Sequence, residues 1–163
     1  MPLQSLELVP DHDGRTQVRA LWQLLRTAGL PSQADHAAAS NEVHLTLAEA
    51  EVLDPDASAV ERLADLLPVV AGVAGLVVLG GPRLAAVALL VVPPPEVVAV
   101  VAGLPGRDAR PWVPHVTLAR RLDRRTAGDV VAVAGSLPEA LRFTELRHWD
   151  PVAHTLTGLV TAE

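Results

Sequence analysis

The tripeptide His-x-Thr occurs twice in this chain, as His44-Leu45-Thr46 and as His115-Val116-Thr117, each time within a strand-like run of apolar residues. Side chains alternate between the two faces of a strand, so each histidine shares a face with its threonine. The apolar neighbours point the other way, where they can pack on a core. Two such strands facing each other would supply two imidazoles and two hydroxyl groups, which is the equipment for acid–base chemistry on a phosphodiester.

Composition excludes several other kinds of chemistry. The 163 residues include no cysteine, which removes disulfides, thiol nucleophiles and thiolate metal sites. All 13 basic residues are arginine, so Schiff-base catalysis, a lysyl-adenylate intermediate and a lysine-containing phosphate loop are excluded as well. The net charge of −6 argues against a protein that coats long duplex nucleic acid. Small substrates, or only the end of a polynucleotide, remain compatible with it.

The chain has the features of a cytoplasmic protein, and we expect a monomer. Its first residues lack the basic start and the apolar run of a secretory leader. The most apolar region, from Leu63 to Val101, is interrupted by prolines, by Gly80-Gly81 and by Arg83. No uninterrupted segment therefore reaches the ~20 residues needed to cross a bilayer, and no membrane partner is expected.

The two motif strands need a scaffold, and the sequence predicts strands and helices around them. Val18, Leu21, Trp22 and Leu25 recur at helical spacing within residues 11–28, and Gly29 follows as a stop signal. A polar loop over 31–41 leads into the first motif strand, 42–48. The other expected strands are 3–9, 76–79, 84–92, 112–119, 142–149 and 154–160, and the other expected helices are 56–67, 96–104 and 123–137.

The order of these elements is similar in the two halves of the chain. Division at Gly81 gives strand, helix, motif strand, helix and strand on both sides, with one extra strand at the end. We therefore predict an α+β fold in one bilobal domain, 1–163, with lobe one at about 1–81 and lobe two at about 82–163. A two-fold-like arrangement of the lobes would make their antiparallel sheets face a central cleft, with a motif strand on either side.

Paired His-x-Thr tripeptides, each on a strand of a small duplicated α+β chain, resemble the two-histidine (2H) phosphoesterase superfamily. The branch most similar is that of 2′-5′ RNA ligase and RNA 2′,3′-cyclic phosphodiesterase, and the resemblance is most specific over 40–47 and 114–120. It implies a LigT-like fold and a reaction without metal or other cofactor. That reaction opens the 2′,3′-cyclic phosphate of a nucleotide or RNA 3′ end to a 2′-phosphomonoester, with reversible 2′-5′ RNA ligase activity.

The resemblance also implies roles for individual residues. His44 and His115 would be the acid–base pair, and the sequence leaves open which of them is the base. Thr46 and Thr117 would donate hydrogen bonds to the phosphate oxygens. Arg120 stands where the family has a phosphate-holding arginine. Because strict alternation turns Arg120 away from His115, this role requires the strand to twist or end there.

Two further residues are candidates for substrate binding. Trp112, or alternatively Trp149, could stack on a base in a chain that has no tyrosine and whose only phenylalanine is Phe143. His36 lies in the polar loop before the first motif and could contact substrate. Simple packing for Trp112 and a solvated loop for His36 are the alternatives. Six arginines surround the second motif, either as a solvated surface or as a nucleic-acid groove: Arg107, Arg110, Arg120, Arg121, Arg124 and Arg125.

Two other functional classes remain open at this point. A nucleotide- or RNA-end-binding protein without significant turnover would keep the same groove. A metal-dependent hydrolase is the other, although the sequence has no His-Glu-x-x-His and offers near the first motif only Glu42, an isolated carboxylate on the face of His44.

Overall fold

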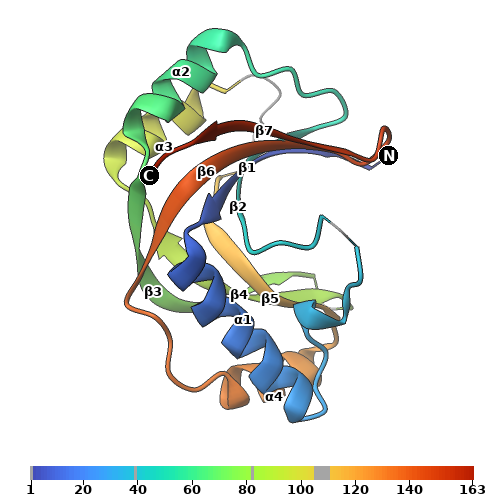
Figure 1. Ribbon diagram of the computed structural model, residues 1–163. Coiled ribbons are helices and arrows are strands. Elements are labelled where there is room, and N and C mark those ends of the chain that lie inside the picture. The colour runs from blue at the N-terminus through green and yellow to red at the C-terminus, as the bar shows by residue number, and fades with distance from the viewer. Residues whose placement is uncertain (1, 39, 82, 105–110) are drawn as a thin grey trace.

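The structure, a computed structural model, describes residues 2–38, 40–81, 83–104 and 111–163 and confirms the α+β class. Helices and strands follow one another in nearly the order that the sequence predicts (Figure 1). The strands are β1 (Gln4–Pro10), β2 (Leu45–Ala50), β3 (Val69–Gly80), β4 (Ala85–Val92), β5 (His115–Leu122), β6 (Ala140–Asp150) and β7 (Thr155–Thr161). The helices are α1 (His12–Thr27), α2 (Ala57–Leu66), α3 (Pro95–Ala102) and α4 (Arg124–Val133), with a short 3₁₀ helix, η1 (Gln33–Asp35).

All strand pairs are antiparallel and form one hydrogen-bonded path in the order β2-β1-β6-β3-β4-β5, with β7 paired to β6. Strand β6 joins the two parts of this path. One of its edges pairs with β1, and the other pairs first with β3, through Val69–Gly72, and then with β7. The path curves so strongly that its two end strands, β2 and β5, contact each other (Figure 1). Strand β5 carries the second His-x-Thr motif, and the first motif begins at His44, the residue before β2.

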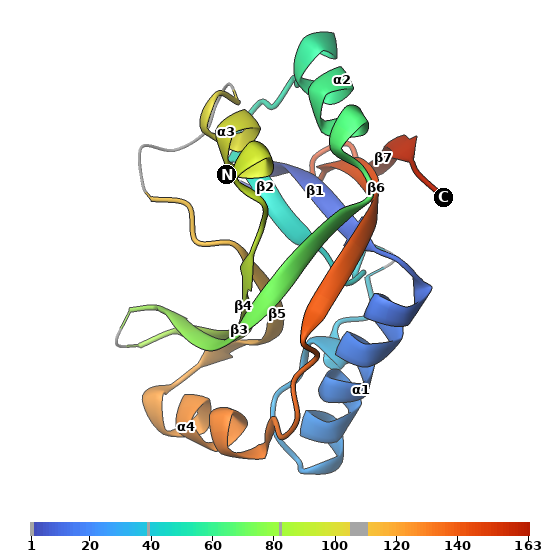
Figure 2. The same cartoon turned by 90° about the vertical axis from the view of Figure 1, so that its left-hand side faces the viewer.

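The two halves of the chain are interwoven rather than side by side. Strand β3 belongs to the first half of the chain but lies with β4 and β5 of the second half. Strand β6 belongs to the second half but lies between β1 and β3 of the first half. Helices α1 and α4 pack against each other near β5, and α2 and α3 pack together at the other end of the molecule (Figure 2). No helix within the described ranges is long and apolar enough to cross a membrane.

Helix α1 forms as its apolar spacing predicts. Its buried face includes Val18, Leu21, Trp22 and Leu25, and the side chain of Asp11 caps its first turn by accepting a hydrogen bond from the Gly14 backbone N–H at 2.9 Å. Gly29, the predicted stop signal, follows the helix with φ of 73°, a left-handed conformation that favours glycine. This helix later supplies one of the contacts that hold the second motif strand.

Several predicted boundaries were wrong. The two motif strands, β2 and β5, begin at Leu45 and His115 instead of residues 42 and 112, and end at Ala50 and Leu122 instead of 48 and 119. Strand β3 begins at Val69 instead of residue 76, and it contains two glycines, Gly72 and Gly75, before the predicted start. Gly75 has φ of 143° at a shift of register against β4, where a glycine is tolerated within an irregular strand. Helix α4 ends at Val133 instead of 137, two residues before Gly135, whose φ is 63°.

Candidate active site

Both motif segments present their polar residues on one face, as the alternation predicts. In the first segment Val43, Leu45 and Leu47 are buried, while His44 and Thr46 are partly exposed. In the second, Val116 and Leu118 are buried, and His115 and Thr117 are partly exposed. The apolar side chains anchor each strand in the core, so the imidazole and the hydroxyl are held on its open face.

The two motif histidines make the same local contact. Nδ1 of His44 lies 2.7 Å from the backbone oxygen of Glu42, and Nδ1 of His115 lies 2.7 Å from that of Val113. A carbonyl only accepts, so each Nδ1 must carry the proton and donate it. Nε2 is then the atom of each ring that can accept or give up a proton, which leaves the same chemical group available on both strands.

A bulge in β5 brings Arg120 to the face of His115 and Thr117. Thr117 pairs with Ala88 and Ala119 with Val87, so two steps along β5 oppose one step along β4. The extra residue reverses the alternation, and the consecutive residues Leu118 and Ala119 are accordingly both buried. Arg120 is therefore exposed on the face of His115 and Thr117. A contact of Arg120 with a phosphate on that face requires such an irregularity in the strand.

Strand β2 has a bulge at the corresponding place. Thr46 pairs with Glu7 and Ala48 with Leu6, again two steps against one, and Leu47 and Ala48 are both buried. The internal repeat thus extends beyond the tripeptide to His-x-Thr-Leu-Ala, a doublet that sequence reasoning had overlooked. The residue after the repeat is Glu49 in the first strand and Arg120 in the second, so the two strands differ in charge at equivalent positions.

Two tryptophans tie the motif strands to the rest of the molecule. Nε1 of Trp22, in α1, donates to the Thr117 carbonyl at 3.0 Å, and Nε1 of Trp112 donates to the Thr46 carbonyl at 3.1 Å. Each bond crosses from one half of the chain to the motif threonine of the other half. The bonds satisfy backbone oxygens on the two end strands and fix how those strands face each other.

A pocket of about 280 Å³ lies beside the first motif. It brings together five residues that the sequence singled out, His36, His44, Thr46, Arg120 and Trp149. The other residues that line it are Leu3, Ser5, Glu7, Gln33, Ala38, Ser40, Asn41 and Glu49. His115, Thr117 and Trp112 are not among the lining residues. His115 and Thr117 belong to β5, which contacts β2, and Trp112 packs partly buried against the core.

A profile of the 2′-5′ RNA ligase superfamily matches residues 9–160, which include both motifs and both bulged strands. The chain belongs to this superfamily. Its members are 2H phosphoesterases, enzymes of phosphodiester chemistry, so the resemblance drawn from the two tripeptides is confirmed.

Solved structures similar to this chain have low sequence identity to it. Usb1 of Kluyveromyces marxianus is 12% identical with a TM-score of 0.49, and its complex with uridine monophosphate gives 12% and 0.47; each comparison covers 97% of both chains. A structure described as a phosphoesterase is 17% identical with a TM-score of 0.46 and covers 100% of both chains. No curated protein matches the sequence.

Beneath His44 lies a buried ion pair that sequence reasoning missed. Nε of Arg147, on β6, donates to Oε2 of Glu7, on β1, at 2.6 Å, and the side chains are only 4% and 5% exposed. The Ser5 hydroxyl donates to the other Glu7 oxygen at 2.6 Å. That same oxygen lies 3.7 Å from His44 Nε2, so it forms an ion pair with the imidazole whenever that ring is protonated. A glutamate within the otherwise apolar run of β1 was the available signal.

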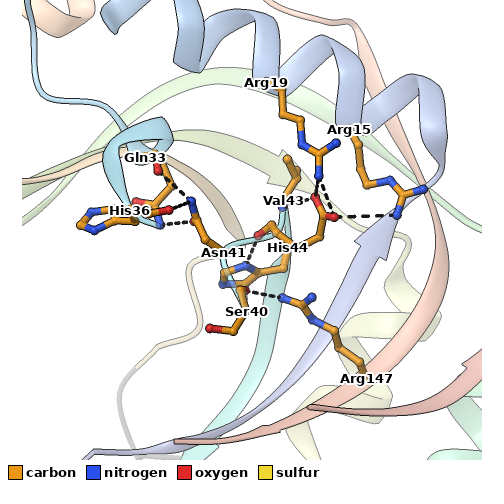
Figure 3. A network of polar contacts seen from close by, with 10 residues as sticks. Arg15, Arg19, Gln33, His36, Ser40, Asn41, Val43, His44 and Arg147 are labelled. Atoms are coloured by element: carbon orange, nitrogen blue, oxygen red, sulfur yellow. Dashed lines mark hydrogen bonds and ion pairs between the residues drawn. The ribbon is translucent and has the colours of Figure 1, made fainter. Parts of the chain in front are cut away.

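Polar contacts on both sides hold the segment that leads to His44 (Figure 3). On one side, Nδ2 of Asn41 donates to the backbone oxygens of Gln33 and His36 at 2.9 and 2.8 Å. On the other, Arg19 binds the Glu42 carboxylate at 2.7 Å, and Arg15 lies 3.9 Å from it. Since the carbonyl of Glu42 orients His44, these contacts set the direction of the imidazole as well.

Glu42 does not share the pocket with His44, contrary to the strict alternation assumed from the sequence. It precedes β2, which begins at Leu45, and its carboxylate turns back to α1 instead. Within the described ranges, no cluster of three or more histidine, aspartate or glutamate side chains is placed to hold a metal ion. Of the arginine cluster, Arg107 and Arg110 lie outside the described residues; the exposed members are Arg120, Arg121, Arg124 and Arg125.

Proposed function

We propose that the protein is a metal-independent cyclic phosphodiesterase that opens the 2′,3′-cyclic phosphate of a nucleotide or RNA 3′ end to a 2′-phosphomonoester, with reversible 2′-5′ RNA ligase activity. The observation that carries the proposal is the matched state of the two motif histidines. Each donates from Nδ1 to a backbone carbonyl two residues earlier, so each keeps Nε2 for proton transfer. Two imidazoles can hold opposite protonation states near neutral pH.

In the proposed reaction one imidazole removes a proton from water while the water oxygen attacks phosphorus. The bond from phosphorus to the ribose 3′ oxygen breaks, and the second imidazole, which starts protonated, gives its proton to that oxygen. The phosphate stays on the 2′ oxygen, and the net change is the addition of one water molecule. In the ligase direction, a 5′-hydroxyl end replaces water as the nucleophile and a 2′-5′ linkage forms.

Three side chains are suited to stabilise the charge that develops on the phosphate. The hydroxyl groups of Thr46 and Thr117 share the open faces of their strands with the histidines and would donate to non-bridging oxygens. Arg120, turned to the same face by the bulge in β5, would add a charge-assisted contact. Of the two tryptophans considered for base stacking, Trp149 lines the pocket, whereas Trp112 supports β2.

A panel of cyclic phosphates tests the proposal. It comprises 2′,3′-cyclic nucleotides, ADP-ribose 1″,2″-cyclic phosphate and RNA with a 2′,3′-cyclic end, each assayed in excess chelator with phosphorus NMR of the product. We expect turnover in chelator and a 2′-phosphate product from the 2′,3′-cyclic substrates. Binding without turnover would show a nucleotide-binding protein instead. Loss of activity on chelation, with recovery on adding a divalent ion, would show a metal-dependent hydrolase.

Removing either threonine hydroxyl should weaken catalysis less than removing a histidine. We expect Thr46→Val and Thr117→Val each to lower kcat by roughly 10- to 10³-fold, because each loses one hydrogen bond to the charged transition state. Serine keeps the hydroxyl, so Thr46→Ser and Thr117→Ser should retain most of the activity. If the valine and serine variants are equally active, the threonines serve only strand packing.

A further inference from the structure

The pocket contains a hydrogen bond between the two residues that the sequence offered as separate substrate contacts. Nε of Arg120, on β5, donates to Nε2 of His36 at 3.1 Å. His36 directly follows η1, in the polar loop before the first motif, and both side chains line the pocket. The bond therefore links the wall formed by this loop to the strand that carries the second motif.

This contact fixes the protonation state of His36. A guanidinium group only donates hydrogen bonds, so Nε2 of His36 must offer its lone pair and the ring must be neutral with its proton on Nδ1. Partial burial lowers the pKa of His36, the positive charges of Arg120 and Arg121 lower it further, and Asp35 opposes them with a smaller effect. The neutral ring is thus the favoured state near neutral pH.

The backbone around His36 is held in place by its own contacts. The Ser32 hydroxyl accepts from the backbone N–H of Ala34, and Asp35 accepts from the backbone N–H of Ser32, which together cap η1. Asn41 holds the carbonyl of His36 itself at 2.8 Å. The backbone that carries His36 is accordingly fixed, whereas Arg120 is a long, exposed side chain that gains a defined direction from the bond.

We propose that His36 is a positioning residue that holds Arg120 by its Nε so that the two terminal nitrogens of the guanidinium face a phosphate group in the pocket. This inference rests on the proposed function for the role of Arg120. Protonation of His36 removes the acceptor and places a second cation beside Arg120, which turns the arginine away. The charged or titratable groups that face His36 are Arg120 and Arg121 of β5, Asp35 of η1, and, within the pocket, Glu7, His44 and Glu49.

Substitutions at His36 separate this role from direct contact with the phosphate. The measurement is the affinity for adenosine 2′-monophosphate at neutral pH. His36→Gln keeps an acceptor for Arg120 and should bind nearly as well as the natural protein. His36→Ala should bind about tenfold more weakly, because Arg120 loses its orienting bond. His36→Lys should bind more weakly still, because a cation repels Arg120.

The matched controls are His12→Gln, His12→Ala and His12→Lys, since His12 is exposed at the start of α1 and does not line the pocket. These three variants should all bind like the natural protein. Affinity of His36→Lys equal to or above that of the natural protein would overturn the proposal, because it would show that a cation at this position contacts the phosphate directly.

The pH dependence of the affinity for a cyclic nucleotide is a second test of the positioning role. The probe is 2′,3′-cyclic AMP, whose phosphodiester does not titrate in the range studied, bound to protein in which His115→Ala prevents turnover. We compare its affinity with histidine and with glutamine at position 36. The affinity with histidine divided by the affinity with glutamine should be near one at neutral pH. This ratio should fall as pH drops through the lowered pKa of His36. A ratio that rises at low pH would overturn the proposal.

Imidazole ¹⁵N NMR tests the contact without any ligand or turnover. His36 should be in the Nδ1–H form in the natural protein and should shift toward the Nε2–H form in Arg120→Ala. Since this readout involves no substrate, it stays decisive if the panel of cyclic phosphates shows no turnover. An Nε2–H ring in the natural protein at neutral pH would contradict the bond and the positioning role.

Discussion

Replacing either motif histidine by alanine should remove most of the activity toward a 2′,3′-cyclic phosphate. We expect His44→Ala and His115→Ala each to lower kcat by about 10²–10⁴-fold, because each deletes one of the two proton transfers that the reaction needs. Both imidazoles are partly exposed and both are oriented through Nδ1 by a backbone carbonyl, so either one can be deleted without opening the core. Steady-state kinetics with a saturating cyclic nucleotide measures the effect.

The double variant and a remote histidine complete this experiment. His44→Ala with His115→Ala should be little worse than the worse single variant, because residues that act as one unit are not additive. His12→Ala, at an exposed position outside the pocket, should keep full activity. Near-native activity of a folded His44→Ala or His115→Ala protein would show that the paired acid–base assignment is wrong.

The largest effect on stability is expected at the ion pair beneath the pocket. Arg147→Met should lower the free energy of unfolding by about 3–5 kcal/mol, because it leaves the Glu7 carboxylate buried without its countercharge. The two side chains are 4% and 5% exposed, so water can replace the lost partner only in small part. Chemical denaturation followed by circular dichroism measures the change.

Two controls separate the loss of charge pairing from the loss of the arginine itself. Adding Glu7→Gln to Arg147→Met should restore most of the stability, since it removes the unpaired charge and keeps an acceptor for the Ser5 hydroxyl. Arg142→Met breaks the partly exposed pair with Asp11, whose side chains are 40% and 27% exposed, and should cost only about 0–1 kcal/mol. A cost for Arg147→Met no greater than that of Arg142→Met would contradict the buried-charge argument.

Features that depend on nearby residues were predictable from the sequence. The face shared by His44 and Thr46 follows from the period of a strand, and helix α1 follows from the spacing of its apolar residues. Both depend on local backbone geometry, which a short run of residues specifies. The α+β class and the family follow from the recurrence of the motif in an equivalent place within each half of the chain.

Features that depend on distant contacts were not predictable in the same way. The bulge that carries Arg120 to the motif face depends on the pairing of β5 with β4, and a single sequence does not state that register. The bond from Arg120 to His36 spans 84 positions, and the pair of Arg147 with Glu7 spans 140. In retrospect the Leu-Ala doublet after each motif was a local sign of the bulges, because two consecutive buried residues interrupt the alternation of a strand.

The pH dependence of kcat/KM for a 2′,3′-cyclic nucleotide in excess chelator tests the central claim most directly. At low pH the catalytic base is protonated and cannot accept a proton from water, and at high pH the catalytic acid is neutral and cannot protonate the leaving oxygen. The two-histidine account therefore predicts a bell-shaped profile with both an acidic and an alkaline limb. A profile that rises steadily with pH and has no alkaline limb would contradict it, because hydroxide would then act without a protonated imidazole.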